Sequence, residues 1–340
     1  MRTLICSFLL IAASRAQQTS AEKLIEEGHW KRARVLVEGR AAEAQQDPRA
    51  CFLLSQVRAA FGDRSGPLPL AERAVVLDPR TAKYHRQVAE VVGMAAQQAG
   101  PLQQLFLARR FRKEIEIALS LDAQDVQALR DLLEFYLLAP GIAGGDRQKA
   151  KTIAQRIHAI DAAEGFLADA RTAQFEKRTG DAETALEQAA AVRPVSYRAA
   201  IELARYDLSA QPPKPSRAEA AAREAMRLYP DRADAYAILS AIYACRASIA
   251  ALDEILVEAA RRVPDDAFPY YSAAERLVAD QRDLDRAQHY LLVYMSQEPE
   301  GNRPTLADAR RLLSRIPAVS GKGGRTGSFG HAGAVEFAVP

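Results

Sequence analysis

The chain of 340 residues is 49% apolar and 26% charged, which is the composition of a globular protein and excludes a disordered or fibrous one. Its 46 basic and 43 acidic residues give a net charge of +3, so the overall charge provides no reason to bind nucleic acid or an acidic lipid surface. We therefore expect no nucleic-acid partner.

The first sixteen residues have the layout of a secretory signal. Arg2 gives a positive start, an apolar run over residues 3–13 follows, and residues 14–16 place small side chains before a cleavage point at Gln17. The run is too short to span a bilayer, although an uncleaved anchor remains the alternative. We expect an exported protein, periplasmic or secreted if the source is bacterial, with no membrane span after cleavage.

Apolar residues three and four positions apart then predict a series of short amphipathic helices. Gly28 ends the first of them, and Trp30 begins the next. In the second pair of helices, Pro67 and Pro69 lie at the start of the second helix. Because proline is tolerated only in a first turn, we expect that helix to begin at about Leu68.

The third and fourth pairs contain insertions. Extra residues around 94–110 predict helices that are longer by two or three turns. A glycine-containing loop, residues 140–146, precedes the second helix of the fourth pair, and Asp146 is expected to be the N-cap of that helix. The backbone amides of this loop could face an anion. The carboxylate of Asp146 would repel an anion, which favours a plain long turn.

The seventh unit, residues 233–266, shows the pattern most clearly. The stripes of its two helices consist of Tyr236, Leu239, Ser240 and Tyr243, and of Leu252, Leu256 and Ala259. Pro264 ends the unit. Two helices of this length cannot bury their stripes alone, so the unit needs neighbours.

Such units end at regularly spaced positions, most of them proline. These positions are Pro48, Pro79, Ala123, Ala162, Pro194, Pro230, Pro264 and Pro299. Most of the intervals fall between 31 and 36 residues, and the two longer ones contain the insertions. This pattern resembles the tetratricopeptide repeat (TPR), a helix-turn-helix unit of about 34 residues with aromatic and small residues at fixed positions and a closing proline.

The resemblance covers most of the chain and implies an all-α, TPR-type helix-turn-helix solenoid. We expect a right-handed superhelix of about eight helix pairs with a C-terminal capping helix at about residues 305–315. The expected domains are the signal peptide at residues 1–16, the solenoid at 17–316 and a disordered glycine-rich tail at 317–340.

The sequence contains no recognisable catalytic or metal-binding motif. The five histidines are scattered one to a unit, and Cys51 and Cys245 are too far apart in an elongated stack to form a disulfide. We expect no enzyme activity, no cofactor and no metal site. An acid or base cluster assembled across units, for example around His85 and Glu90, is the enzymatic alternative.

In tetratricopeptide repeat proteins the first helix of each unit lines a concave face that binds protein or peptide partners. The resemblance therefore implies a partner-binding surface in units two, three and eight, made of charged groups beside exposed aromatic rings. Its residues are Arg49, Phe52, Gln56, Lys83, Arg86, Glu90, Phe268, Tyr271 and Glu275. We expect a scaffold or adaptor with a protein or peptide partner. The alternatives are an accessory domain of a cell-envelope or carbohydrate-processing enzyme complex and an ordinary solvated helix face.

Overall fold

The computed structural model describes residues 20–39, 41 and 46–317, and the regular elements in these ranges are helices, with no strand. Residues 20–27 are helical. The helices after them are α2 (Trp30–Glu38), α3 (Pro48–Ala60), α4 (Pro67–Leu77), α5 (Ala82–Ala96), α6 (Pro101–Leu121), α7 (Val126–Leu138), α8 (Arg147–Ile160), α9 (Ala162–Phe175), α10 (Thr179–Ala191), α11 (Tyr197–Ser209), α12 (Pro215–Leu228), α13 (Ala233–Cys245), α14 (Ile249–Arg262), α15 (Phe268–Ala279), α16 (Leu284–Met295) and α17 (Leu306–Leu313). The 3-10 helix η2 (Gly141–Ala143) lies between α7 and α8. The predicted series of helix pairs with a final capping helix is confirmed.

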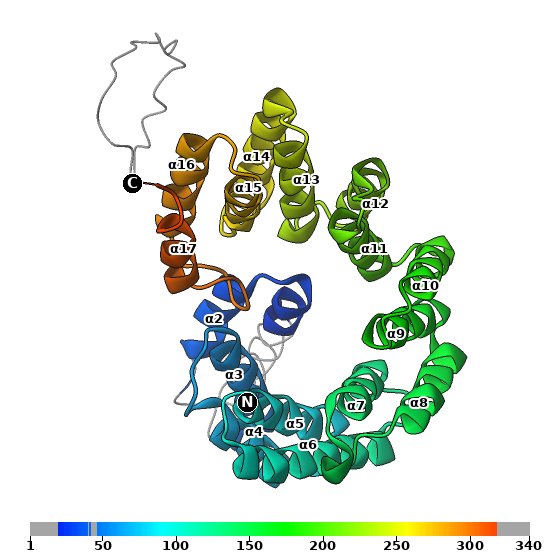
Figure 1. Ribbon diagram of the computed structural model, residues 1–340. Coiled ribbons are helices and arrows are strands. Elements are labelled where there is room, and N and C mark those ends of the chain that lie inside the picture. The colour runs from blue at the N-terminus through cyan, green and yellow to red at the C-terminus, as the bar shows by residue number, and fades with distance from the viewer. Residues whose placement is uncertain (1–19, 40, 42–45, 318–340) are drawn as a thin grey trace, which may run out of the picture.

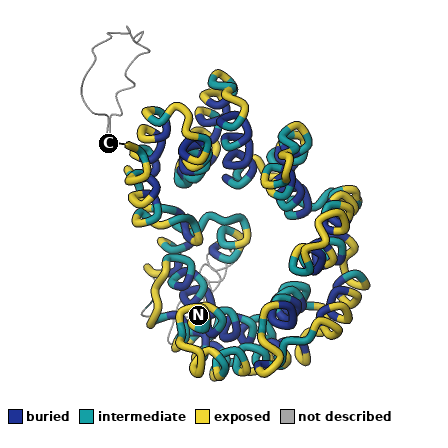
Figure 2. Tube along the Cα trace, in the orientation of Figure 1, coloured by how far each residue is buried: buried dark blue, intermediate teal, exposed yellow. Residues whose placement is uncertain are grey.

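The helix pairs are arranged around a ring (Figure 1). Helices α5, α7, α9 and α11 face its opening, and α6, α8, α10 and α12 lie outside them. The buried residues concentrate between these inner and outer layers (Figure 2), because each amphipathic helix turns its apolar stripe toward its neighbours. The inner surface of the ring is therefore made mainly by the first helix of each pair.

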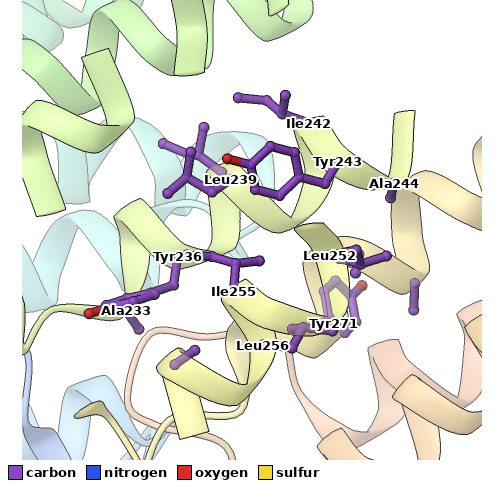
Figure 3. Packing of buried hydrophobic residues seen from close by; sticks show 14 of the residues in the cluster. Ala233, Tyr236, Leu239, Ile242, Tyr243, Ala244, Leu252, Ile255, Leu256 and Tyr271 are labelled. Atoms are coloured by element: carbon purple, nitrogen blue, oxygen red, sulfur yellow. The ribbon is translucent and has the colours of Figure 1, made fainter. Parts of the chain in front are cut away.

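The seventh unit packs as its sequence pattern predicts. Tyr236 and Leu239 of α13 are 1% and 0% exposed, and they lie in one apolar cluster with Leu252 and Leu256 of α14 and Tyr271 of α15 (Figure 3). Removing such a side chain would leave a cavity between three helices, which is why the unit depends on its neighbour.

Several local predictions are confirmed. Helix α4 begins at Pro67, within one residue of the predicted start. The insertion of the third unit lengthens α6 to 21 residues. Asp146 is the N-cap of α8, where its Oδ1 accepts hydrogen bonds from the amides of Gln148 and Lys149. Cys51 is buried and Cys245 is half-buried.

The prediction of an elongated stack is wrong, because the two ends of the solenoid meet. The amide of Asn302, between α16 and α17, donates to the carbonyl of Ala60 at the end of α3, with an N···O distance of 2.9 Å. The resemblance predicts the structure of one repeat unit. It does not predict the rotation from one unit to the next, and the sum of these rotations closes the ring here.

The proposed signal at residues 1–16 and nearly all of the proposed tail at 317–340 lie outside the described residues. Among the helices that the structure describes, none combines the length and the apolar character that crossing a bilayer requires.

Candidate functional site

Two of the predicted residues, Arg49 of unit two and Lys83 of unit three, form a polar network with Glu22 of the first helical segment. Glu22 accepts hydrogen bonds from Lys83 and Arg49, with a Lys83 Nζ to Glu22 Oε1 distance of 2.8 Å. Burial opposes ionisation of Glu22, but these two cations outweigh it and lower the pKa of the carboxyl. Gln56 is half-buried on the same helix as Arg49.

The prediction that the Phe52 and Tyr271 rings are exposed is wrong. Phe52 is only 4% exposed and packs against Tyr84, with ring centroids 5.4 Å apart. Tyr271 is 8% exposed and packs against Tyr294, with centroids 5.1 Å apart. The Phe52 ring fills the contact between α3 and α5, and the Tyr271 ring fills the contact between α15 and α16, so both rings stabilise the fold and do not present a binding surface.

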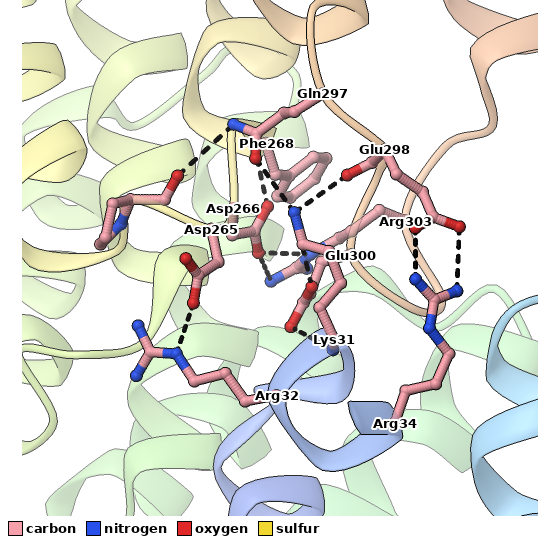
Figure 4. Close-up of polar contacts among 11 residues, drawn as sticks. Lys31, Arg32, Arg34, Asp265, Asp266, Phe268, Gln297, Glu298, Glu300 and Arg303 are labelled. Atoms are coloured by element: carbon pink, nitrogen blue, oxygen red, sulfur yellow. Dashed lines mark hydrogen bonds and ion pairs between the residues drawn. The ribbon is translucent and has the colours of Figure 1, made fainter. Parts of the chain in front are cut away.

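The other predicted residues of unit eight lie elsewhere. Phe268 is half-buried beneath the Arg303 guanidinium, which lies 4.4 Å from the ring centroid. Glu275 is exposed on α15. Phe268 therefore lies beside the contacts that close the ring, where Arg303 covers its aromatic ring (Figure 4).

Arg86 and Glu90 belong to an acidic cluster at the boundary of α5 and α7. Arg86 pairs with Glu90 at 2.8 Å and with Asp125 at 3.1 Å. Burial raises the pKa of Glu90. Burial, with the nearby charge of Glu90, raises the pKa of Asp131 to about 7. Asp131 accepts one hydrogen bond from Gln127, at 3.2 Å, and its Oδ2 is buried without a hydrogen-bond partner in the described part of the chain.

This cluster lies at one end of a large apolar groove, which we call the α5–α7 groove. It has a volume of about 800 Å³ and is bounded by the second half of α5, the first half of α6, the end of α7 and η2. Its apolar wall includes Met94, Leu105, Phe111, Leu138 and Ile142. The size is that of a site for a drug-sized molecule or for several side chains of a peptide.

The charged residues that line the α5–α7 groove are all acidic. They are Glu90, Asp131 and Glu134, with no lysine or arginine in the lining. Leu138 and Ile142 are 59% and 76% exposed, which is unusual for large apolar side chains at the mouth of a groove. Glu90 already pairs with Arg86, and Glu134 pairs with Arg171. The groove therefore suits an apolar ligand that places a positive group at Asp131.

Sequence reasoning missed the groove, although both of its parts were visible. The insertions at residues 94–110 and 140–146 were interpreted separately as a longer helix and a long turn. They belong to consecutive units, so the fold places them side by side. Insertions in two neighbouring repeats are the sequence signal that would have indicated a groove between them.

A second constellation closes the ring, and we call it the seam. It joins residues 29–34 to three segments: the turn between α12 and α13, the turn between α14 and α15, and the loop 297–303 that follows α16 (Figure 4). The Lys31 amide donates to Glu300 Oε1 at 3.0 Å, and Arg34 Nη1 donates to Glu298 Oε1 at 2.9 Å. These contacts link residues more than 260 positions apart.

Two buried charges lie within the seam. Arg303 pairs with Asp234 and Asp266, each at 3.0 Å. Glu300 is 3% exposed, and burial raises its pKa to about 7 despite the hydrogen bond from the Lys31 amide. The seam is thus a desolvated polar interface, unlike the apolar contacts between the other units.

Both ring nitrogens of His85, a residue of the enzymatic alternative, have partners within the fold. Its Nδ1 lies 2.8 Å from Glu114 Oε2, and its Nε2 lies 3.1 Å from the carbonyl oxygen of Pro79. The ring is 7% exposed, so both nitrogens serve to hold α5 against α6 and the preceding turn.

Solved tetratricopeptide repeat proteins share this architecture. The chain superposes on TTC0263 from Thermus thermophilus with a TM-score of 0.50 and 18% identity, over 57% of this chain and 98% of that one. A tetratricopeptide repeat protein from Parabacteroides merdae gives 0.47 and 10%, over 90% and 99% of the two chains. PilF from Pseudomonas aeruginosa gives 0.36 and 16%, over 75% and 91%.

The chain is therefore a helical solenoid of the tetratricopeptide repeat type. No protein-family model and no curated protein matches the sequence. At these identities the structural likeness supports the fold, and the function has to be argued from the chain's own surfaces.

Proposed function

We propose that this protein is a non-catalytic scaffold outside the cytoplasm that binds a basic, amphipathic segment of a partner protein in the α5–α7 groove. The observation that carries the proposal is an apolar groove of about 800 Å³ whose charged lining residues are all acidic. An amphipathic helix or extended segment would place its apolar side chains against Met94, Phe111 and Leu138. A lysine or arginine of the partner would face Asp131, whose Oδ2 has no donor among the residues that the structure describes.

The inner wall extends this proposed surface. It would include Arg49 and Gln56 on α3, Lys83 on α5, and Phe268 and Glu275 on α15. Export is supported by the layout of residues 1–16 alone, and it remains part of the proposal.

Paired peptides test the groove. A 16-residue amphipathic peptide with lysines on its polar face, and the same peptide with glutamates in their place, are titrated against the protein by fluorescence anisotropy. We expect saturable micromolar binding of the basic peptide, and at least about tenfold weaker binding of the acidic one, which corresponds to about 1.4 kcal/mol.

Variants then locate the site. Leu138→Lys together with Ile142→Lys should weaken binding of the basic peptide at least about tenfold, because it places two cations at the mouth. Val257→Lys on α14 is the matched control, since Val257 is 69% exposed and outside the groove. Equal affinity for both peptides, or equal losses in both variants, would refute the groove as the binding site.

A further inference from the structure

Three side chains of metal-ligating types meet at the seam although they come from distant parts of the chain. They are Glu27, His29 and Asp231, and one donor atom of each lies within 4.8 Å of the other two. The His29 Nε2 to Asp231 Oδ2 distance is 3.7 Å. Sequence spacing could not reveal this group, because Asp231 lies about two hundred residues from the others.

The backbone holds two of these ligands in place. Gly28, between Glu27 and His29, has a φ of +88°, which an L-residue rarely adopts. The amides of Gly28 and His29 donate to the carbonyls of Ile25 and Leu24 at 3.0 and 2.7 Å, and these two bonds close the end of the first helical segment. The His29 side chain is only 12% exposed, so its ring has little freedom to turn away.

The surroundings of the three ligands favour a cation. They line a small cavity of about 30 Å³, enough for one water-sized species. The carboxylates around the cavity are Glu27, Asp231, Asp234, Asp265, Asp266 and Glu300. Only Arg32 and Arg303 oppose these six charges in the lining, which leaves a formal charge of about −4 with a neutral imidazole.

A second observation points to a missing positive partner. Glu300 lines the same cavity and its side chain is only 2% exposed. Its Oε2 has no hydrogen-bond donor within residues 20–39, 41 and 46–317. Lys31 Nζ is 3.8 Å from that oxygen, but it donates to Gln297 Oε1 at 3.0 Å and to the Glu298 carbonyl at 2.9 Å. A buried carboxylate oxygen without a donor is costly unless a cation compensates it.

We propose that Glu27, His29 and Asp231 bind a divalent transition-metal ion, Zn²⁺ by preference, which fastens the N-terminal helices to the turn between α12 and α13. An imidazole beside two carboxylates suits Zn²⁺ better than Ca²⁺ or Mg²⁺, which bind oxygen ligands. Tetrahedral coordination at about 2.0–2.2 Å places donor atoms about 3.4 Å apart. The donor atoms lie within 4.8 Å of one another here, so the side chains must bring them closer by up to about 1.4 Å. Water completes the shell on the side of the half-exposed Asp231, and the ion's charge compensates Glu300.

Zinc binding to the untagged, full-length, chelator-treated protein tests the proposal. Calorimetric titration with ZnCl₂ should give one site with a Kd below about 10 µM, and Zn²⁺ should raise the melting temperature. His29→Ala and Asp231→Asn should each weaken binding at least about tenfold. Asparagine has nearly the shape of aspartate, and the Asp231 side chain is half-exposed, so Asp231→Asn should fold. Its zinc affinity therefore tests the proposal even if His29→Ala fails to fold.

His289→Ala is the matched control, because His289 is exposed on α16 and outside the cluster. It should bind Zn²⁺ as the parent does. Absence of saturable binding by the parent below about 100 µM, or equal affinity in the parent and Asp231→Asn, would overturn the proposal. Loss of binding in His289→Ala alone would also overturn it, since the ion would then lie elsewhere.

Discussion

Replacing Gly301 by leucine is expected to open the ring at its seam. A Cβ atom at Gly301 would lie 2.8 Å from Cβ and Cγ of Trp30 and 3.0 Å from Cβ of Ala60. These distances are shorter than carbon atoms adopt in a packed interior, and leucine adds three further carbons. Residue 301 cannot move aside within the closed ring, because its neighbours Glu300 and Asn302 are both hydrogen-bonded across the seam.

The size of the effect follows from two competing costs. Keeping the seam closed around the leucine costs about 1–3 kcal/mol of overpacking, with leucine at the upper end. Separating the surfaces loses the Lys31–Glu300 and Asn302–Ala60 hydrogen bonds, about 2–4 kcal/mol together. The exposed pair Arg34–Glu298 adds little. Because the two costs are comparable, a substantial fraction of the molecules should be open.

Trp30 is the only tryptophan in the chain and lies in the seam, so its fluorescence reports the opening directly. We expect a red-shifted emission and a larger radius of gyration by small-angle X-ray scattering, at unchanged helicity. Gly180→Leu is the control, since a Cβ there meets nothing within 4 Å. Parental emission and radius in Gly301→Leu would refute the argument that these contacts hold the ring closed.

Three further predictions concern stability. Leu239→Ala should lower the free energy of unfolding by about 2–5 kcal/mol in chemical denaturation, because Leu239 is fully buried between three helices, and a smaller loss than about 1 kcal/mol would contradict that packing. Arg217→Ala should lower the free energy of unfolding by about 3–5 kcal/mol, because the fully buried Asp207 carboxylate then lacks the guanidinium that pairs with both of its oxygens. The double variant Arg217→Ala with Asp207→Ala should recover part of that loss. Asp131→Asn should stabilise the protein by about 2 kcal/mol at pH 8 and hardly at all at pH 4. The folded state raises the pKa of Asp131 from 3.8 to about 7, so the parent loses stability as pH rises through that window, and an equal difference between the two proteins in urea at both pH values would exclude this cause.

The local features of the fold were predictable because they depend on neighbours in sequence. The stripe of Tyr236 and Leu239, the start of α4 at Pro67 and the N-cap at Asp146 each follow from spacing within one or two turns. The exposure of Phe52 was predicted wrongly for a related reason. The face of an inner helix includes positions that contact the next inner helix, and the sequence of one unit does not distinguish them from positions that face the opening.

The seam and the α5–α7 groove depend on relations between units. Lys31 and Glu300 meet only because small rotations from unit to unit add up to a full turn, and no local pattern encodes that sum. The groove depends on two insertions in consecutive units, one of which contributes Met94 and the other Ile142. The sequence shows each insertion, but only the fold shows that they face each other.

Closure changes how the protein should come apart. An open array of repeats frays from its two ends, since the terminal units have one neighbour each. Here the first and last units each have two, so neither end is free to unwind before the seam breaks. Amide hydrogen exchange should then be as slow in α2 and α16 as in α9, and the array should melt as one cooperative body, whereas a chain cut at the seam would lose its outer units first.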